Sequence, residues 1–269
     1  MAPTDHTHDV PFERWLQTAP GAFLAEWERR AFDRAVVDLF GYHALQLGLH
    51  ACDTLDANRM PHRWLALDQI QAVPHAHVGD GEWVASSSRS LLLCDFHALP
   101  FPEHSLDLVT LPHTLELSPD PHGTLAEVER VLIPEGRVVI SGLNPASLWG
   151  LRQWRSRHLP GARRPFVPAS GEWIGHRRLR DWLRLLNFEV ETVQFGCYRP
   201  SFESPVWLDR FAWMDGLGRR SWPIFGAGYF LVAVKRVRGM RLMGQTWRRR
   251  PALVNAPVSV ANKSHRNSR

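Results

Sequence analysis

Three short runs of apolar residues in the middle of the chain constrain its fold more than any other feature. They cover residues 90–95, 106–111 and 137–141, and the first of them ends in an acid. Their residues do not strictly alternate between apolar and polar, as they would in a strand with one face in water. A helical pattern at 122–132 separates the last two runs, and strands that alternate with helices favour a parallel sheet covered on both faces. The sequence therefore predicts a doubly wound α/β fold.

Further elements can be placed on either side of this block. Apolar residues recur at three- and four-residue spacing over 23–40 and predict an amphipathic helix that Gly41 ends. The segment 71–89 contains Pro, Gly, His and Ser and is expected to be a loop. Asn187 can close the helix before it by taking the left-handed cap conformation. The remaining expected elements are strands at 42–48, 64–68, 188–195 and 229–234, a weak helix at 51–60 and a helix at 176–186.

The length and the charge distribution predict one domain followed by a tail. The 269 residues fit a single α/β domain. The formal charge is +5, but residues 235–269 hold ten Lys or Arg and no acid, which leaves −5 on residues 1–234. The basicity of the chain is therefore weak support for nucleic-acid binding by the fold. We expect an N-terminal segment and helix at 1–40, an α/β domain at 41–236 with cap insertions at about 144–175 and 199–225, and a disordered basic tail at 237–269.

Cysteine and histidine spacing indicates no metal site, and the hydropathy indicates no membrane span. The three Cys are far apart and form no CxxC motif. The pairs His6–His8 and His75–His77 stand in loops without further ligands and are interpreted as solvated side chains. No stretch reaches the roughly 18 apolar residues of a membrane span, and the first residues lack the apolar core of a signal peptide. We expect a cytoplasmic protein without a metal.

A series of motifs resembles a known enzyme family. Residues 95–109 contain an acid, then Leu-Pro-Phe, then an acid-x-Ser-x-Asp-x-Val run. Asp120-Pro121 precedes a helix that leads into Arg-Val-Leu-Ile-Pro-Glu-Gly at 130–136, and Asn-Phe-Glu-Val follows at 187–190. In this order and spacing the motifs resemble the class I S-adenosylmethionine-dependent methyltransferases, specifically the methyltransferase type 11 group.

The resemblance is dense over 90–142 and weaker over 41–70 and 176–236. It implies a seven-stranded, mostly parallel sheet with a C-terminal antiparallel hairpin, and S-adenosyl-L-methionine as the cofactor. The implied cofactor crevice lies at the carboxyl ends of the first strands. This is also where open α/β sheets in general bind their ligands.

Residues at the ends of three expected strands match cofactor-binding positions of the family. Asp95 stands where the family places an acid at the adenine, and the Phe96 backbone can pair with the ring; the alternative is that Asp95 caps a local turn. Asp68 ends a strand 20 residues after Gly48, where the family places a ribose-binding acid. A solvated acid at a strand end is the alternative for Asp68. Thr110 matches, by position only, the backbone that flanks the methionine part of the cofactor.

The loop after the first strand departs from the family pattern of an acid followed by three spaced glycines. The aligned positions are Gln46, Gly48, His50 and Cys52, so one glycine remains. Glycine serves there because the backbone turns with positive φ and comes close to the ligand. Gln46 can still accept a hydrogen bond but lacks the charge that strengthens one. With Gln46 and Gly48 as its candidate ligands, the loop predicts a weakened cofactor site.

Two further features bear on the chemistry. His113, just past the fourth strand, is the candidate general base because its unperturbed pKa is near neutral; the alternative is a structural histidine at a strand end. The segment 149–157 interleaves Trp with Arg, and Arg163-Arg164 follows. We interpret it as a substrate cap anchored by its Trp residues, although such a segment could also touch a membrane surface or bind nucleic acid with the tail.

These observations lead to two main hypotheses from different classes. The first is a methyltransferase that transfers a methyl group to a small-molecule or lipid-like acceptor. The second is a non-catalytic methyltransferase-like protein for binding or regulation, which the glycine-poor loop favours. An RNA methyltransferase guided by the basic tail is a third, less favoured hypothesis. The oligomeric state is not predicted.

Overall fold

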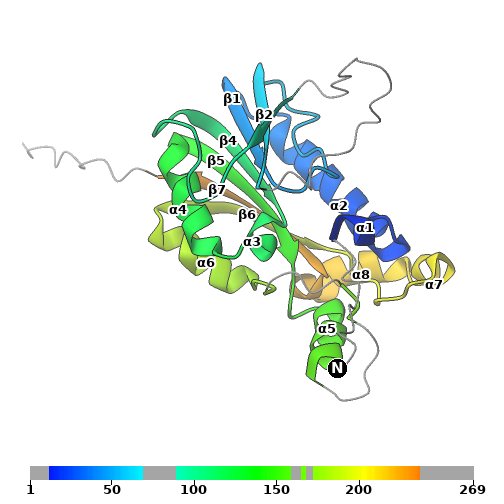
Figure 1. Cartoon of the computed structure of the whole chain (residues 1–269). Coiled ribbons are helices and arrows are strands. Elements are labelled where there is room, and N and C mark those ends of the chain that lie inside the picture. Colours follow the sequence, from blue (N-terminus) through cyan, green and yellow to red (C-terminus); the bar gives the residue numbers. More distant parts are fainter. Residues whose placement is uncertain (1–11, 69–88, 159–164, 168–171, 237–269) are drawn as a thin grey trace, which may run out of the picture. The chain divides into compact units, whose positions relative to one another are not determined.

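Seven strands form one sheet in the computed structural model, which describes residues 12–68, 89–158, 165–167 and 172–236. Six strands run in the same direction, and β7, which lies between β5 and β6, is antiparallel to both (Figure 1). The predicted doubly wound fold with a C-terminal antiparallel hairpin is confirmed. In sheet order the strands are β3 (Ser90–Leu93), β2 (His62–Leu67), β1 (His43–Leu47), β4 (Leu106–Pro112), β5 (Leu132–Leu143), β7 (Gly228–Lys235) and β6 (Phe188–Gly196).

The direction in which the sheet grows changes at β1. The chain builds outward from β1 through β2 and β3, and then returns to add β4 on the other side of β1. Open α/β sheets bind ligands at such a switch point, outside the carboxyl ends of the strands. Gln46 is in register with Leu65 of β2 and Thr110 of β4. The last residues of β1 therefore mark the place where a crevice can open.

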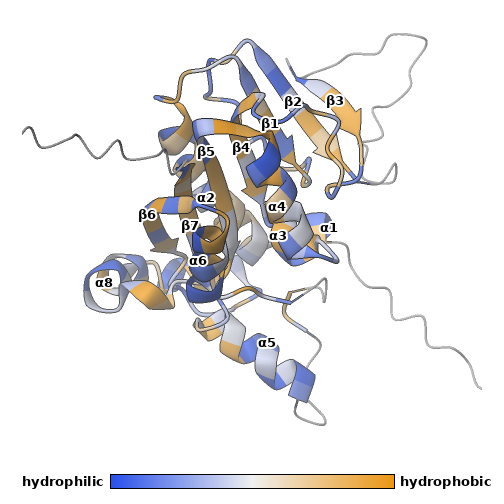
Figure 2. Ribbon diagram, turned by 90° about the vertical axis from the view of Figure 1, so that its left-hand side faces the viewer, coloured by the Kyte–Doolittle hydropathy of each residue, from blue (hydrophilic) through white to orange (hydrophobic). Residues whose placement is uncertain are grey.

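The two faces of the sheet are covered by different helices. Strand residues alternate between the faces, so Ala44 and Phe230 pack with α2 (Ala19–Val36). Their neighbours Leu45 and Leu231 pack on the other side with α4 (Pro121–Val131) and α6 (His176–Leu185). Figure 2 shows the hydrophobic colour concentrated in the strands between these helices. This burial on both faces explains why the strand sequences lack a strict alternation.

Capping residues determine where the main helices begin and end. The Thr18 hydroxyl accepts a hydrogen bond from Gly21 N, so α2 begins at Ala19 and not at residue 23. The Asp120 carboxylate accepts from the N–H groups of His122 and Gly123 at the start of α4. Asn187 has φ of 60° directly after α6, which confirms the predicted left-handed cap.

The weak helix predicted over 51–60 is wrong, because this segment forms turns. The Asp53 carboxylate accepts from Leu55 N, and the Asn58 side chain accepts from Met60 N. Such local bonds offer the backbone an alternative to helical hydrogen bonds. The Asn58 amide also donates to Val36 O and ties the segment to the end of α2.

The structure contains several short helices that the sequence did not predict. Short helices without a long apolar period escape detection from sequence. Three expected features lie outside the described residues. They are the loop at 71–89 apart from its last residue, the basic tail, and both His-x-His pairs. The additional helices are α1 (Phe12–Leu16), α3 (Thr114–Leu117), α5 (Leu148–His158), α7 (Pro205–Arg210), α8 (Trp213–Ser221) and the 3₁₀ helix η2 (Pro223–Phe225).

Replacing Phe32 tests how much the packing of α2 against the sheet contributes to the stability of the fold. The ring is fully buried and meets Phe230 edge-on with 5.0 Å between centroids. Phe32→Ala should lower the free energy of unfolding by about 3–5 kcal/mol, since it leaves a cavity in the core. Urea denaturation measures this effect. Phe40→Ala, at a ring 78% exposed, is the matched control and should change stability little; equal losses in both variants would contradict the packing.

Candidate functional site

The carboxyl ends of several strands converge at Gly48, directly after β1. Gly48 has φ of +69°, and its N–H donates to Ala66 O near the end of β2. A Cβ at this position would lie 3.6 Å from Thr114 Oγ1 and 3.7 Å from the Phe96 ring. Thr114 in turn donates to Leu47 O. The one retained glycine therefore occupies a left-handed turn where the ends of β1, β3 and β4 meet.

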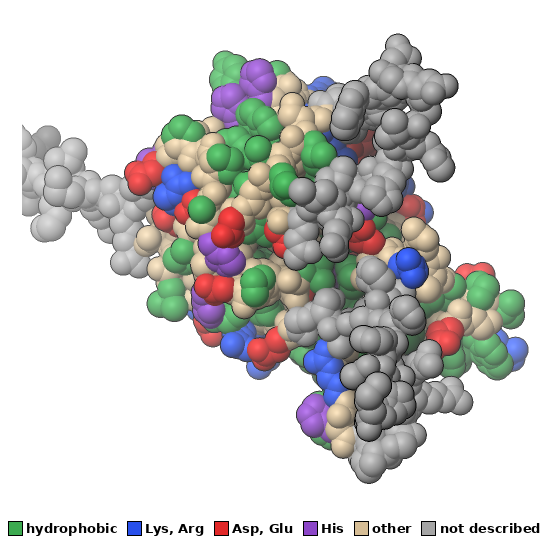
Figure 3. Space-filling model, in the orientation of Figure 1, with side chains coloured by type: hydrophobic (Ala, Val, Ile, Leu, Met, Phe, Trp, Pro, Cys, Tyr) green, Lys and Arg blue, Asp and Glu red, His purple; other side chains and the backbone are tan. Residues whose placement is uncertain are grey.

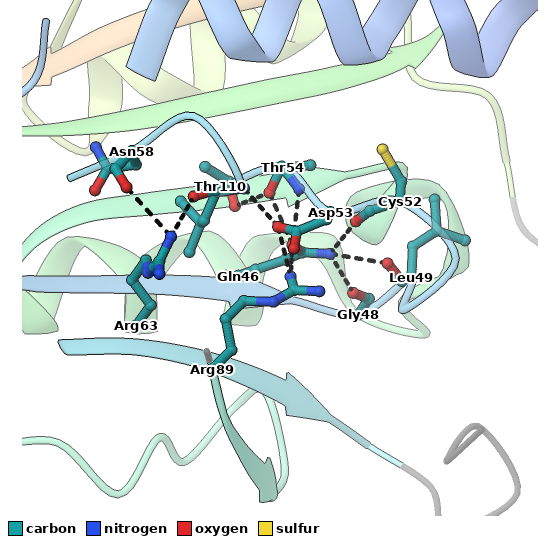
Figure 4. A network of polar contacts seen from close by, with 11 residues as sticks. Gln46, Gly48, Leu49, Cys52, Asp53, Thr54, Asn58, Arg63, Arg89 and Thr110 are labelled. Atoms are coloured by element: carbon teal, nitrogen blue, oxygen red, sulfur yellow. Dashed lines mark hydrogen bonds and ion pairs between the residues drawn. The ribbon is translucent and has the colours of Figure 1, made fainter. Parts of the chain in front are cut away.

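The side chain of Gln46 organises the loop that follows β1 (Figure 4). Its amide nitrogen donates to the carbonyls of Leu49 at 2.8 Å and Cys52 at 2.7 Å, and more weakly to that of Gly48 at 3.3 Å. Its oxygen accepts from the N–H and hydroxyl of Thr54. Gln46 is fully buried. A carboxylate has no proton to donate to three carbonyls, so an amide suits this loop where the family pattern has an acid.

Arg89 and Thr110 complete the same network from neighbouring strands. Arg89, just before β3, donates to the Gln46 oxygen at 2.8 Å and pairs with Asp53 at 3.0 Å. The Thr110 hydroxyl lies 2.6 Å from that of Thr54, and Thr110 is fully buried within β4. Burial lowers the pKa of the Arg89 guanidinium, against the attraction of Asp53. Sequence analysis missed Arg89, whose only signal is a charge beside an apolar run.

The predicted acids Asp68 and Asp95 lie at the exposed ends of β2 and β3. Asp68 is exposed directly after β2. The Asp95 carboxylate, 68% exposed, accepts from His97 N at 2.8 Å and contacts the His97 ring at 2.9 Å. The His97 backbone N–H, more than its ring, lowers the pKa of Asp95. Phe96, the next residue, is buried toward Gly48. Asp95 thus stabilises a local turn while most of its carboxylate faces solvent.

His113 directly follows β4 beside the end of β5, and its ring lies between two glutamates. Its ring nitrogens lie 2.9 Å from Glu28 of α2 and 2.8 Å from Glu116 of α3, and all three residues are buried. Glu116 also accepts from the Leu143 N–H at the end of β5. Burial disfavours the charged imidazole, but the charges and hydrogen bonds of Glu28 and Glu116 outweigh it and raise the pKa of His113 to about 10. The histidine therefore holds its proton at neutral pH.

Helix α1 covers the loop after β1 and His113. The Phe12 ring lies 4.8 Å from the His113 ring, and Glu13 pairs with His50 at 2.7 Å. Phe12, Trp15 and Leu16 belong to one hydrophobic cluster with Leu49 and Cys52, which we call the α1 cluster. Its other buried members are Leu24, Leu143, Trp149, Phe166, Val167, Cys197 and Ala227. Burial raises the pKa of the Cys52 thiol to about 12. His50 is thus paired with α1, and Cys52 belongs to the same cluster as the buried residues of that helix.

Substitution of Gln46 tests the loop network. Gln46→Ala leaves the buried Arg89, Thr54 and three backbone carbonyls without their common partner. Each unsatisfied buried group costs about 1–3 kcal/mol, so a loss toward the upper end of this range is expected in urea denaturation. Gln194→Ala, at an exposed position of β6, is the control. A loss no larger than that of the control would contradict the network.

The charge on His113 predicts a pH-dependent stability. His113→Gln should lower the free energy of unfolding by about 3–5 kcal/mol near pH 6, because it leaves two buried carboxylates without their cation. The folded-state pKa of about 10 exceeds that of an unfolded histidine. The stabilisation is therefore complete below about pH 6.5 and is lost as the pH rises through about 10.

The measurement for this prediction is urea denaturation of both proteins between about pH 6 and pH 10. The gap between wild type and variant should shrink as the pH rises. His158→Gln, at the exposed end of α5, is the control. A gap that stays constant over this range would show that His113 is neutral in the fold.

Residues 66–140 match the family model described as a methyltransferase domain. An uncharacterised protein of Escherichia coli K12, YafS, is 46% identical over 92 residues, which cover 34% of this chain and 36% of YafS. The demethylmenaquinone methyltransferase of Chlamydia pneumoniae is 30% identical over 94 residues, which cover 35% of this chain and 38% of that protein. The aligned segments thus span little more than a third of these curated relatives.

Solved structures share the fold at low sequence identity. A S-adenosylmethionine-dependent methyltransferase from Thermotoga maritima has a TM-score of 0.57 at 15% identity, and the match covers 84% of this chain and 94% of that one. A methyltransferase solved with the activator Trm112 of Haloferax volcanii has a TM-score of 0.55 at 18% identity, with 85% and 97% covered. Together with the matched domain, they bear out the resemblance seen in the motifs at 90–142. The chain therefore contains a segment that matches a methyltransferase domain, and it shares the fold of S-adenosylmethionine-dependent methyltransferases.

Proposed function

We propose that this chain transfers a methyl group from S-adenosylmethionine to a small-molecule or lipid-like acceptor. The observation that carries the proposal is the set of groups at the strand ends, where the left-handed turn at Gly48 is accompanied by the exposed carboxylates of Asp68 and Asp95. An adenosyl group presents ribose hydroxyls and an exocyclic amine, and carboxylates are suitable acceptors for these donors. The donor set therefore fits the nucleoside half of the cofactor.

Each residue at the strand ends has a distinct proposed role. Asp68 would accept the ribose hydroxyls, and Asp95 with the adjacent Phe96 would bind the adenine. Gly48 would let the backbone approach the cofactor, since the nearest atoms to a Cβ at this position lie at ordinary contact distance. Gln46 and Thr110 are buried and hydrogen-bonded to the protein. We assign them to shaping the loop and the end of β4.

The reacting end of the site depends on positioning. When bound, S-adenosylmethionine supplies a methyl group on a sulfonium, and its transfer needs mainly correct placement of the acceptor. A protein base is needed only where the acceptor must lose a proton. His113 is buried and holds a proton between Glu28 and Glu116, which does not suit a general base. We assign His113 a positioning role that joins α2, α3 and the end of β5.

Two observations favour an apolar acceptor. The relative from Chlamydia pneumoniae is named for demethylmenaquinone. An apolar cavity of about 900 Å³ opens where the chain leaves β5, lined by residues that include Leu148, Trp173 and Phe225. Nucleic acid is less favoured, because residues 1–234 carry −5. On the face shown in Figure 3, acidic and histidine side chains are interspersed with hydrophobic ones.

Calorimetry with the cofactor tests the proposal. Wild-type protein should bind both S-adenosylmethionine and its demethylated product, S-adenosylhomocysteine. Asp68→Ala should weaken binding by about 1–3 kcal/mol through loss of charge-assisted hydrogen bonds. Asp38→Ala, an exposed carboxylate just after α2, is the control and should bind as wild type does. Absence of heat with either compound would favour the non-catalytic alternative, and equal affinity of both variants would exclude Asp68 from the site.

A further inference from the structure

An exposed apolar surface is formed by α5 and residues 205–225. We propose that this docking surface seats the protein on a bilayer that contains anionic lipids. It holds ten of the sixteen large hydrophobic side chains that are exposed among the described residues, and four of the ten are Trp. A monomeric protein rarely gathers exposed apolar residues in this way without a partner. The ten are Leu148, Leu151, Trp154, Val206, Trp207, Trp213, Leu217, Trp222, Ile224 and Phe225.

Trp149, in the first turn of α5, anchors this helix to the core and so fixes its exposed side. Trp149 is fully buried in the α1 cluster, and its indole N–H donates to Arg199 O at 2.8 Å. With Trp149 anchored, Leu148, Leu151 and Trp154 point outward and are 47–55% exposed. Figures 1 and 2 show α5 and α8 at the same end of the molecule. The apolar side chains are therefore presented by a fixed part of the fold.

The cavity of about 900 Å³ lies within this surface, between α5, α8 and η2. Three of its polar lining residues are already bonded within the protein. Gln153 exchanges two hydrogen bonds with the Val167 backbone, the Ser147 hydroxyl bonds to Asn144 O and Gly150 N, and the Tyr198 hydroxyl donates to Pro223 O. A ligand would thus meet mostly apolar groups, and the volume is in the usual range for ligand sites. Such a cavity suits an acyl chain.

Positive charge accompanies the apolar residues. Helix α5 contains three Arg and no acid, and the two acids of 205–225, Asp209 and Asp215, both pair with Arg199. Within the described part of the chain, no carboxylate lies at ion-pair distance from Arg155, Arg157 or Arg220. Anionic headgroups complement this charge.

The mixture of residue types favours lipid over nucleic acid or protein. Trp places its ring at the boundary of acyl chains and headgroups, and Arg pairs with the headgroup phosphates. Bases stack on aromatic rings and guanidinium planes, which leaves the exposed Leu148, Leu151, Val206 and Ile224 without a partner on RNA. Anionic lipid offers a partner to the aliphatic, aromatic and basic side chains alike.

Flotation of the full-length protein with vesicles tests the docking surface. Wild type should float with phosphatidylcholine vesicles that contain phosphatidylglycerol, and much less with phosphatidylcholine alone. The double variant Trp154→Ser/Trp222→Ser should reduce the bound fraction roughly tenfold, because two interfacial anchors are lost. Arg155→Glu/Arg157→Glu should reduce it too, and should weaken its dependence on salt. The control variant Phe40→Ser/Leu185→Ser changes two exposed side chains outside the docking surface and should float as wild type does.

Thermal melting followed by circular dichroism verifies that each variant is folded, and the Arg variant keeps the test valid if the Trp variant does not fold. The proposal is overturned if wild type stays unbound at the bottom of the gradient. It is also overturned if the folded Trp variant floats as wild type does, a result that would assign binding to the basic tail. It is also overturned if the Phe40/Leu185 control loses binding equally. Release of wild type by an RNA oligonucleotide, with tighter RNA binding than vesicle binding, would assign the surface to nucleic acid instead. Cofactor binding is measured separately, so this result stands apart from the proposed methyl transfer.

Discussion

The hydrogen bonds of the Gln46 amide are the interaction on which the candidate site depends. A loop that must bend sharply after β1 turns several carbonyls inward, where water cannot reach them. Gln46 donates to the carbonyls of Leu49 and Cys52 and accepts from Thr54 and Arg89. Buried backbone groups without partners are costly. One side chain thus supports the turn of the chain at Gly48.

The replacements at His50 and Cys52 gain a physical explanation from α1. His50 pairs with Glu13, and Cys52 is buried in the α1 cluster, to which Trp15 and Leu49 also belong. The larger side chains therefore serve as contacts for an N-terminal helix that covers the loop. Trp149 belongs to the same cluster, so the loop after β1, α1 and α5 share one set of packing contacts.

The buried charges at His113 connect the helical cover to the sheet. Two carboxylates from α2 and α3 face one imidazolium, and the α3 carboxylate also holds the end of β5 through Leu143 N–H. Burial raises the pKa of Glu116, against the opposing effects of His113 and the Leu143 N–H. Such a group of charges is stable only while all members are present. Because His113 directly follows β4, this group of buried charges holds the strand ends that form the candidate site.

The sequence by itself determined the mostly parallel sheet with its C-terminal antiparallel hairpin, and the acids at the ends of β2 and β3. These features follow from local patterns, because a doubly buried strand must be apolar along its length and a crevice residue must follow a strand directly. The left-handed cap at Asn187 could be predicted for the same reason. Local hydrogen bonds of Asp53 and Asn58, in contrast, replaced the helix expected at 51–60.

Only the tertiary structure decided what Gln46, His113, Arg89 and the cap helices do. Gln46 meets Arg89 across 43 positions of sequence, and His113 meets Glu28 across 85. No local pattern encodes such pairs, since each depends on where separate strands and helices come to rest. The protonation of His113 follows from the same cause. Its charge is set by two carboxylates that folding brings to it, and the sequence around residue 113 contains only one of them.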